Sequence, residues 1–483
     1  MKKSQMLHII LVLLLGAAVG ALSAQDHWPT WRGPDTMGIA PESNPPTTWS
    51  ETKNIKWKVK LTGDGSNSSP IVWGDKIFFQ SAVDTGIKDT SAVAAPAAED
   101  AAGRRSRARD AGRGRVRGGR DAGRGGSSGR GSGRGGFGRG SGRGGFGVTP
   151  PTTQFKFNLV CMDRGTGKIL WEKTVCQLKP HQGHHRDHGY ASFSPITDGQ
   201  HVWAHFGSRG IYCYDMEGNQ IWSKELPQMR TMFGEGTAPS LAGDALIVVA
   251  DHQGDSAILA FDKKTGNLLW KEARDESTTH ATPVPVTVDG KLQVIIAATD
   301  FTRAYDAQTG DVIWQCCGLT RNVIPTPVVG FGMVYCTSGF RGSALQAIRL
   351  GQTGDLTGSD AIVWELDKST PYVPSPLLYE GRIYVCKSNN EVISCYNAKT
   401  GKPHFVEQKM DEMKGVYASP VAAAGRVYVV GRNGVFHVLN ASDSFEVLAV
   451  NRLDDKFDCS PAFAGDEMYL KGKQYLYCVA AAG

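Results

Sequence analysis

The chain has 483 residues, with 53 Lys and Arg against 47 Asp and Glu and a formal net charge of +6. This length exceeds that of a small disulfide-stapled domain, and it leaves room for several domains or for one large repeat fold. The segment from Lys88 to Thr153 holds 14 Lys or Arg and 5 Asp or Glu, so it carries +9 and the rest of the chain carries −3. The basic character therefore belongs to one segment and not to the fold.

Residues 1–24 have the pattern of a secretory signal peptide. Lys2 and Lys3 form a basic start, an apolar run extends from Leu7 to Val19, and small residues follow up to Ala24. The apolar run is short for a membrane span, and no Cys near the expected cleavage point would take a lipid anchor. The sequence predicts a soluble periplasmic or secreted chain without a transmembrane helix in its mature form.

Residues 25–54 form an N-terminal extension ahead of the first repeat. Its aromatic stretch, Trp28 to Pro34, is short, and we expect it to pack against the rim of the fold. A role in binding a peptide-like ligand is the alternative for these exposed aromatic residues.

An insertion interrupts the regular pattern from Asp84 to Thr153. Its core, Gly103 to Gly147, holds 13 Arg among Gly and Ser, and it contains too few apolar residues to offset chain entropy. We therefore predict a disordered Arg/Gly-rich loop. Arg pairs with phosphates and Phe stacks on bases, as in the RGG tracts of RNA-binding proteins, which the copies Gly133–Phe137 and Gly142–Phe146 resemble.

The predicted export changes the expected partner of this loop. An anionic glycan, a lipid head group or another polyanion, bound through residues 103–147, fits an exported protein better than a nucleic acid does. The alternative is a tolerated loop with no dedicated partner.

The rest of the chain repeats one pattern. A strand over Ala257–Phe261 is followed by a turn over Asp262–Gly266 and a second strand that ends in Trp270. A Pro after Ser, Thr or Ala opens each unit, and after the first unit the intervals are 44, 44, 44, 49, 44 and 41 residues. These residues are Pro70, Pro195, Pro239, Pro283, Pro327, Pro376, Pro420 and Pro461. Four short strands at this period predict an all-β propeller with eight blades over residues 55–483.

The two ends of the chain predict how the ring closes. The last unit ends after its third strand, near Val479, while the strand around Trp57 has no unit before it. Trp57 lies 13 residues before Pro70, the same spacing as Trp270 to Pro283. We therefore expect the N-terminal strand to complete the last blade and to remove the open sheet edge.

An aromatic residue at the end of the outer strand recurs in these units. The motif A-x-D-x-x-T-G-x-x-x-W is well matched at Asp163–Trp171, Asp262–Trp270 and Asp306–Trp314, and more loosely at Asp215–Trp222. It resembles the pyrroloquinoline-quinone-type (PQQ-like) propeller repeat. That resemblance implies that the indole stacks on a neighbouring blade's turn. The docking residues would be Trp57, Trp171, Trp222, Trp270, Trp314, Trp364 and Phe405, with Leu448 in the eighth place.

The ten Cys do not form the pattern of a disulfide framework. Four of them, Cys161, Cys213, Cys395 and Cys478, occupy equivalent strand positions in different units. We expect buried thiols that behave as small apolar residues.

Polar residues collect on one face of the predicted propeller. This face carries the loops before each Ser/Thr/Ala-Pro and the hairpins between strands two and three. We call it the upper face; the D-x-x-T-G turns lie on the lower face. The candidate binding residues on the upper face are Arg209, Asp251, His252, Asp255, His280, Arg321, Asn322 and Arg341. Asp251 and His252, with Asp255 or His280, are also a candidate acid–base pair.

A dense run of histidines lies in one loop of the same face. His181, His184, His185 and His188 have the donor type for a transition-metal ion, but their spacing matches no zinc motif, and Arg186 opposes a cation. Hydrogen-bonded loop histidines are the alternative.

The resemblance leaves two functional classes open. In similar quinoprotein dehydrogenases a vicinal disulfide packs on the cofactor, which would give Cys316 and Cys317 a role with PQQ and calcium. However, the pair directly follows Trp314, and the long insertions of those enzymes are missing. The chain also resembles the non-catalytic propeller subunit of the outer-membrane β-barrel assembly machinery. We therefore predict a binding or scaffold module without cofactor or catalytic residues, with protein partners on its upper face; a PQQ-dependent alcohol-type dehydrogenase is the alternative.

Overall fold

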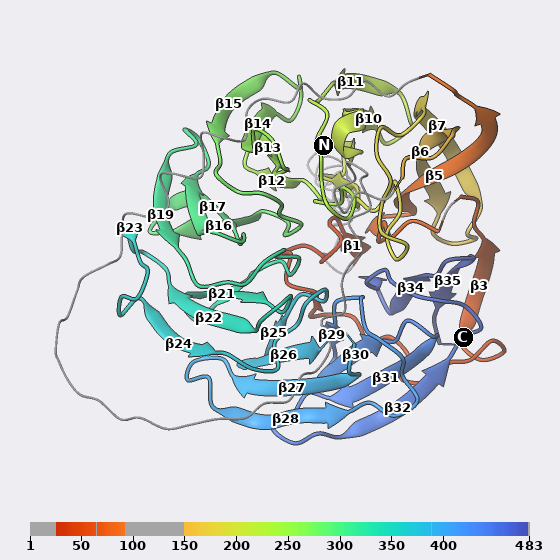
Figure 1. Ribbon diagram of the computed structural model, residues 1–483. Coiled ribbons are helices and arrows are strands. Elements are labelled where there is room, and N and C mark those ends of the chain that lie inside the picture. Colours follow the sequence, from red (N-terminus) through yellow and green to blue (C-terminus); the bar gives the residue numbers. More distant parts are fainter. Residues whose placement is uncertain (1–25, 64, 92–148, 388, 482–483) are drawn as a thin grey trace, which may run out of the picture.

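The computed structural model describes residues 26–63, 65–91, 149–387 and 389–481. These residues form eight sheets arranged in a ring, which confirms the predicted eight-bladed propeller (Figure 1). The predicted signal peptide and the core of the Arg/Gly-rich insertion lie outside the described residues, so export and disorder stay predictions. Within the described part of the chain, no helix has the length and apolar character needed to cross a membrane.

Each blade has four antiparallel strands, which follow one another outward from the central axis in chain order except in the last blade. The first four blades consist of β4 Ile71–Trp73, β5 Lys76–Lys88, β6 Thr153–Asp163 and β7 Ile169–Leu178; β8 Ile196–Thr197, β9 His201–His205, β10 Ile211–Asp215 and β11 Gln220–Lys224; β12 Ser240–Ala242, β13 Ala245–Ala250, β14 Ala257–Asp262 and β15 Leu268–Ala273; and β16 Val284–Val288, β17 Lys291–Ile296, β18 Thr302–Asp306 and β19 Val312–Cys316.

The other four blades repeat this order. They consist of β20 Val328–Gly330, β21 Met333–Ser338, β22 Ala344–Arg349 and β24 Ile362–Leu366; β25 Leu377–Tyr379, β26 Arg382–Lys387, β27 Val392–Asn397 and β28 Pro403–Lys409; β29 Val421–Ala423, β30 Arg426–Val430, β31 Val435–Asn440 and β32 Val447–Arg452; and β33 Ala462–Ala464, β34 Glu467–Lys471, β35 Tyr475–Val479 and the N-terminal β3 Ile55–Lys60. A 3-10 turn, Gly207–Arg209, follows β9.

The ring closes as predicted. Strand β3 is antiparallel to β35, with Trp57 opposite Cys478 and Lys58 opposite Tyr477. Figure 1 shows the C-terminus beside β3 at the outer edge of this blade. Backbone pairing between the two ends of the chain therefore satisfies the edge that a three-stranded last blade would expose.

The boundaries of the insertion differ from the expected ones. Strands β5 and β6 continue as a long hairpin beyond Asp84, with Lys88 opposite Thr153, and the amide of Asp89 donates to the carbonyl of Thr152. Residues 84–88 are therefore ordered strand, because cross-strand hydrogen bonds extend the ladder past the point where the hydrophobic alternation ends. The insertion leaves the first blade by the hairpin between its second and third strands.

The interval from Pro327 to Pro376 is longer than the other intervals after the first unit, at 49 residues, because a connection within the fifth blade contains an additional strand. The connection between β22 and β24 contains β23, Gly354–Asp355, which pairs in parallel with the outer strand of the preceding blade, Trp314 opposite Gly354. The added residues thus cover the outer edge of the fourth blade.

The aromatic residues of the outer strands dock on the next blade as the resemblance implies. The indole N–H donates to the carbonyl of the residue after the motif's Asp or Asn, for example Trp270 to Ala307 at 3.0 Å and Trp57 to Arg164 at 3.0 Å. Trp171, Trp222 and Trp364 make the same bond. We call these five residues the docking ring. The turn's Gly allows the close approach, because a Cβ at Gly266 would lie 2.6 Å from Trp222.

Three positions depart from this ring. The indole N–H of Trp314 has no partner among the described residues, and the next blade has the connection with β23 in place of a D-x-x-T-G turn. Phe405 makes an edge contact with Phe445 of the next blade, with ring centroids 5.7 Å apart, and Leu448 is 45% exposed.

The core lies between neighbouring blades. All six residues of β13 are buried, whereas exposed residues recur along the outer strand β15. The four Cys at equivalent positions are free and 0% exposed, as expected, and burial raises their thiol pKa values to about 12.

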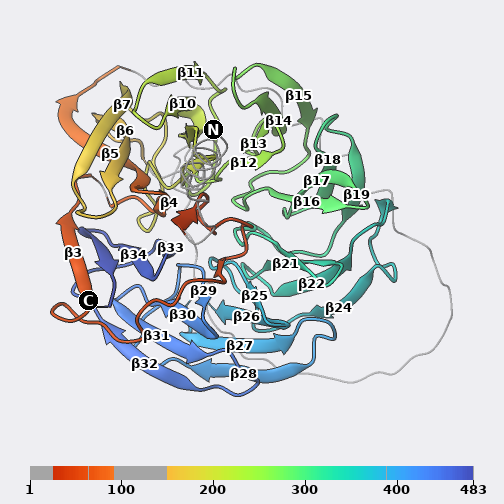
Figure 2. The same cartoon turned by 180° about the vertical axis from the view of Figure 1, so that it is seen from behind.

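The aromatic stretch of the N-terminal extension does not pack against the rim. Its strand β1, His27–Trp28, pairs with β4, and β2, Ile39–Ala40, pairs with β29, so it crosses the centre of the ring along two innermost strands (Figure 2). Between them, the fully buried Arg32 donates to the carbonyls of Pro376 and Pro420. The extension is drawn inward because the short innermost strands leave unpaired backbone groups there.

Candidate functional site

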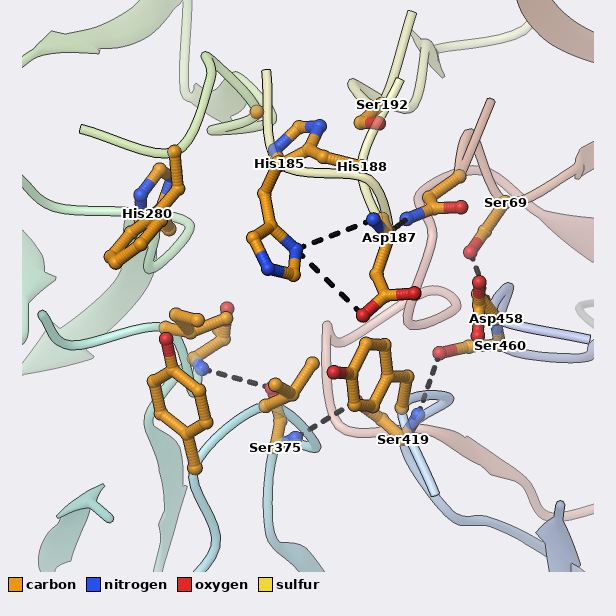
Figure 3. Close-up of a pocket in the computed structure, with 18 of the residues that line it drawn as sticks. Ser69, His185, Asp187, His188, Ser192, His280, Ser375, Ser419, Asp458 and Ser460 are labelled. Atoms are coloured by element: carbon orange, nitrogen blue, oxygen red, sulfur yellow. Dashed lines mark hydrogen bonds and ion pairs between the residues drawn. The ribbon is translucent and has the colours of Figure 1, made fainter. Parts of the chain in front are cut away.

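A cavity of about 540 Å³ lies at the centre of the upper face. Its walls come from the loops before the innermost strands and from three hairpins between second and third strands, which contribute Phe340, Asn389 and Arg432. Many of the side chains that line the cavity on this face are polar. Figure 3 shows the cavity with His280 on the side opposite Asp458.

Buried hydroxyls surround this cavity. They belong to the residues that precede the repeat prolines, and all line the cavity: Ser69, Ser194, Thr282, Thr326, Ser375, Ser419 and Ser460. We call these seven residues the hydroxyl ring. Each is at most 5% exposed. In the third blade Ala238 takes the corresponding place.

Neighbouring blades are linked through these hydroxyls. The backbone amide of one member donates to the hydroxyl oxygen of the next at 2.9–3.0 Å: Ser69 to Ser194, Thr282 to Thr326, Thr326 to Ser375, Ser375 to Ser419, Ser419 to Ser460 and Ser460 to Ser69. Figure 3 shows the link from Ser419 to Ser460 at one wall. The series of links is interrupted at Ala238, which has no hydroxyl oxygen to accept a hydrogen bond.

The N-terminal extension closes the floor. Trp31 lines the cavity, and its indole N–H donates to the Thr282 hydroxyl at 3.2 Å. The Arg32 guanidinium lies 5.7 Å from the Trp31 ring, and burial lowers its pKa to about 9. The aromatic stretch that the sequence placed at the rim is thus part of the site.

Aromatic rings form one wall. Phe340 stacks on Tyr372 with centroids 5.0 Å apart, and the edge of Phe233 meets Phe340 at 6.1 Å. All three line the cavity and are partly exposed to it. The Tyr372 hydroxyl accepts a hydrogen bond from the Asn322 side chain at 2.9 Å.

The opposite wall carries a compensated charge cluster. Arg432 donates to Asp458 at 2.6 Å and to Asp187 at 3.0 Å, and its guanidinium lies 3.8 Å from the centre of the Tyr417 ring. Burial raises the pKa of Asp187, but the bond to Arg432 outweighs it and keeps this carboxyl below its ordinary range. Lys473 adds a second cation 3.2 Å from Asp458.

The four histidines proposed as metal ligands have separate contacts. His181 bonds the carbonyl of Met229 at 2.7 Å, His184 that of His185, and His188 that of Gly189. His185 projects into the cavity, with Nδ1 3.7 Å from the Asp187 carboxylate (Figure 3). Among the described residues, no three His, Cys, Asp or Glu side chains are grouped so that they would hold a metal ion. The structure therefore does not bring the four together.

Only two of the eight upper-face candidates line the cavity, namely His280 and Asn322. His188 and His280 lie 6.3 Å apart, and burial lowers their pKa values to about 3 and about 4. Both are therefore neutral imidazoles near neutral pH.

The other candidates lie below the cavity or around its rim. Arg209 is buried in an ion pair with Glu235 at 3.0 Å, and Asp251 in one with Arg274 at 2.8 Å. Because Asp251 is already paired, it does not form the proposed acid–base pair with His252. Three others are exposed, Asp255, Arg321 and Arg341.

The vicinal thiols of the fourth blade are remote from this site. Cys316 ends β19 and is buried, Cys317 follows it, and both are free. Neither lines the cavity.

The sequence carried a signal for some of the missed site residues. Every hydroxyl-ring member stands next to a repeat proline, so the strand marker and the lining of the cavity are the same positions. No local signal pointed to Arg432 with Asp458, because their partnership depends on two loops that meet only in the ring.

Comparison with known proteins supports the fold. Residues 156–358 match the family model described as outer membrane protein assembly factor BamB. No curated protein matches this sequence. The chain is a β-propeller protein built from PQQ-like repeats, as its motifs predict.

Three solved structures are similar to this chain. BamB from Moraxella catarrhalis is 16% identical, with a TM-score of 0.49 over 69% of this chain and 92% of that one. The computationally designed Ika8 protein is 12% identical, with a TM-score of 0.50 over 69% of this chain and 96% of that one. A europium-containing methanol dehydrogenase is 10% identical, with a TM-score of 0.54 over 92% of this chain and 89% of that one. At such identities the likeness to the designed protein and to the dehydrogenase extends to the fold alone.

Proposed function

We propose that this protein is an exported, non-catalytic binding module that holds a ligand or a partner segment in the cavity of its upper face. The observation that supports this most is the hydroxyl ring, through which seven blades direct hydrogen-bonding groups toward one closed-floored cavity. Cavities of roughly 300–1,000 Å³ with a few convergent polar groups are the usual form of ligand sites.

The charges of the cavity fit binding better than catalysis. Its two carboxylates, Asp187 and Asp458, are both ion-paired with Arg432. A general base needs a carboxylate or imidazole that is available to a substrate proton, and an ion pair with Arg reduces that availability.

A PQQ-dependent dehydrogenase remains the alternative class. The residues present do not suit it well, because the vicinal thiols lie away from the cavity and the cavity carboxylates are occupied by Arg432. The test is to incubate the purified protein with PQQ and Ca²⁺ and to measure bound quinone absorbance and dye-linked alcohol oxidation. We expect neither. Stoichiometric quinone with dye reduction would overturn the binding-module proposal.

The Arg/Gly-rich insertion adds electrostatic capture of anionic partners in this proposal. Because Lys88 pairs with Thr153, residue 91 faces residue 150, and an Asn-Gly link between residues 91 and 149 would close the hairpin with a three-residue turn without disturbing the blade. We expect the full chain to bind vesicles of anionic phospholipid, about tenfold more weakly in 0.3 M than in 0.05 M NaCl. The variant lacking residues 92–148 should not bind. Salt-independent binding by that variant would remove the insertion from the proposal.

A further inference from the structure

We propose that the central cavity binds a neutral carbohydrate, such as the end of a glycan chain, through the hydroxyl ring and the aromatic wall. This inference deepens the binding role proposed above and rests on it. Three independent properties of the cavity lead to it: its unused hydrogen-bond donors, its cancelled charge and its aromatic faces.

The first property is the state of the hydroxyl ring. A Ser or Thr hydroxyl has one donor and two acceptor sites. In the described chain these hydroxyls accept bonds from neighbouring amides or from Trp31, and none donates to another protein group. Buried donors without a partner are costly, so the cavity suits a ligand with acceptors around its periphery. A polyhydroxylated sugar ring has that distribution. Its own O–H groups can donate to the second lone pair of each oxygen in the hydroxyl ring.

The second property is the absence of a net charge. Two cations balance the two carboxylates: Arg432 lies 3.0 Å from Asp187 and 2.6 Å from Asp458, and Lys473 lies 3.2 Å from Asp458. His188 and His280 are neutral because burial disfavours their charged forms. Arg186 at the mouth keeps 89% of its side chain in solvent. A phosphate or carboxylate ligand would thus be desolvated beside two carboxylates and without a free buried cation, which is unfavourable.

The third property is the aromatic wall. Phe340 and Tyr372 are stacked on each other, and Trp31 lies on the floor with Arg32 on one side. Such rings offer apolar faces next to hydroxyl and amide groups, among them the Asn322–Tyr372 pair. The C–H face of a sugar ring packs on an aromatic face while its hydroxyls reach the surrounding donors. An apolar ligand would leave the donors unpaired, and a wholly polar one would leave the rings unused.

The test is calorimetric titration of the full chain with maltotriose, mannotriose and tri-N-acetylchitotriose, with trigalacturonate as the anionic counterpart. We expect saturable binding of at least one neutral trisaccharide and at least tenfold weaker binding of trigalacturonate. If no neutral trisaccharide binds, or if trigalacturonate binds more tightly, the proposal is wrong.

Two pairs of variants locate the binding. Phe340→Ala should weaken it about tenfold, whereas Phe331→Ala, an exposed Phe on the lower face, should leave it within about twofold. Thr326→Val removes one hydroxyl donor and should also weaken sugar binding about tenfold. Thr326→Ser keeps the hydroxyl and should bind the sugar as the unchanged chain does. Thermal unfolding of each variant separates lost binding from lost folding. Equal binding by Phe340→Ala and Phe331→Ala would place the sugar elsewhere and overturn the proposal.

Failure here is distinguishable from failure of the binding-module role. The vesicle and quinone assays contain no sugar, so they stand or fall independently of the trisaccharides. Dye-linked alcohol oxidation would overturn the non-catalytic role. It would not affect a result for sugar binding, because that binding is measured without quinone.

Discussion

The two ends of each blade carry repeats that use hydrogen bonds in different ways. On the lower face, each indole of the docking ring donates to a backbone carbonyl of the next blade, so donor and acceptor are both consumed inside the protein. On the upper face, the hydroxyl ring accepts backbone amides and keeps its own hydrogens unused. The lower ring therefore joins the blades, while the upper ring joins them and also offers groups to a ligand.

The two ends also differ in their charge. Turn residues such as Asp262 and Thr265 bond each other at the surface. Below the cavity, by contrast, the ion pairs Arg209–Glu235 and Asp251–Arg274 are almost completely removed from solvent. Buried charges are tolerated only when paired, so the upper half of the blades is the half that substitution of a single charge disturbs most.

The largest effect is expected for Asp251→Ala. It leaves the Arg274 side chain, which is 0% exposed, without its carboxylate partner, and this should lower the free energy of unfolding by about 3–5 kcal/mol. Chemical denaturation measures the loss. The matched control on the lower face is Asp443→Ala, which breaks a partly exposed pair with Arg382 and should cost at most about 1 kcal/mol. Equal losses in the two variants would contradict the proposed difference between the ends.

Gly266→Ala tests the docking ring. Its φ of +70° is unfavourable for Ala, and its new Cβ would lie 2.6 Å from the Trp222 ring, so we expect a loss of about 2–4 kcal/mol. Gly290→Ala provides the control, because Gly290 has a φ of +77° but no atom within 4 Å. The difference between the two variants in chemical denaturation isolates the docking contact. If they lose the same stability, the Gly is required only for its backbone conformation. Binding in the cavity should be unchanged in both.

Acidification should destabilise the upper end through His205. Its side chain is 0% exposed, Nδ1 donates to the Thr237 carbonyl, and burial lowers its pKa from 6.5 to about 4. Below pH 6.5 the unfolded state therefore binds more protons than the folded state, so stability falls as the pH drops toward 4 and this contribution levels off below that. Linkage gives a loss of about 2 kcal/mol between pH 7 and pH 5. His205→Gln should remove this part of the pH dependence; an unchanged slope would assign it to other groups.

The smallest effect concerns the gap in the hydroxyl ring. Ala238→Ser supplies a hydroxyl where the amide of Ser194 lacks the acceptor that the pattern provides elsewhere, and it should stabilise the fold by about 0.5–1 kcal/mol. Ala238→Cys, with a similar volume but a much weaker hydrogen-bonding group, should not. Thermal unfolding distinguishes them. A destabilised Ser variant would mean that the gap is sterically required.

The sequence by itself determined the parts of this protein that repeat. The proline intervals predicted eight blades, the unpaired strand around Trp57 predicted the closure with β35, and the turn motif predicted the docking of Trp270 and its equivalents. These features depend on contacts within one blade or between adjacent blades, so each is encoded in a short window and confirmed by its recurrence.

Only the tertiary structure decided which polar residues share the cavity. His280 and Asn322 reach it, whereas Arg209 and Asp251 are taken up by ion pairs beneath it, and Arg32 is drawn into the centre of the ring. The reason is geometric. Ring closure brings eight loops from distant parts of the chain to one axis, and the choice of partners there depends on which unpaired groups meet, a property that no local pattern records.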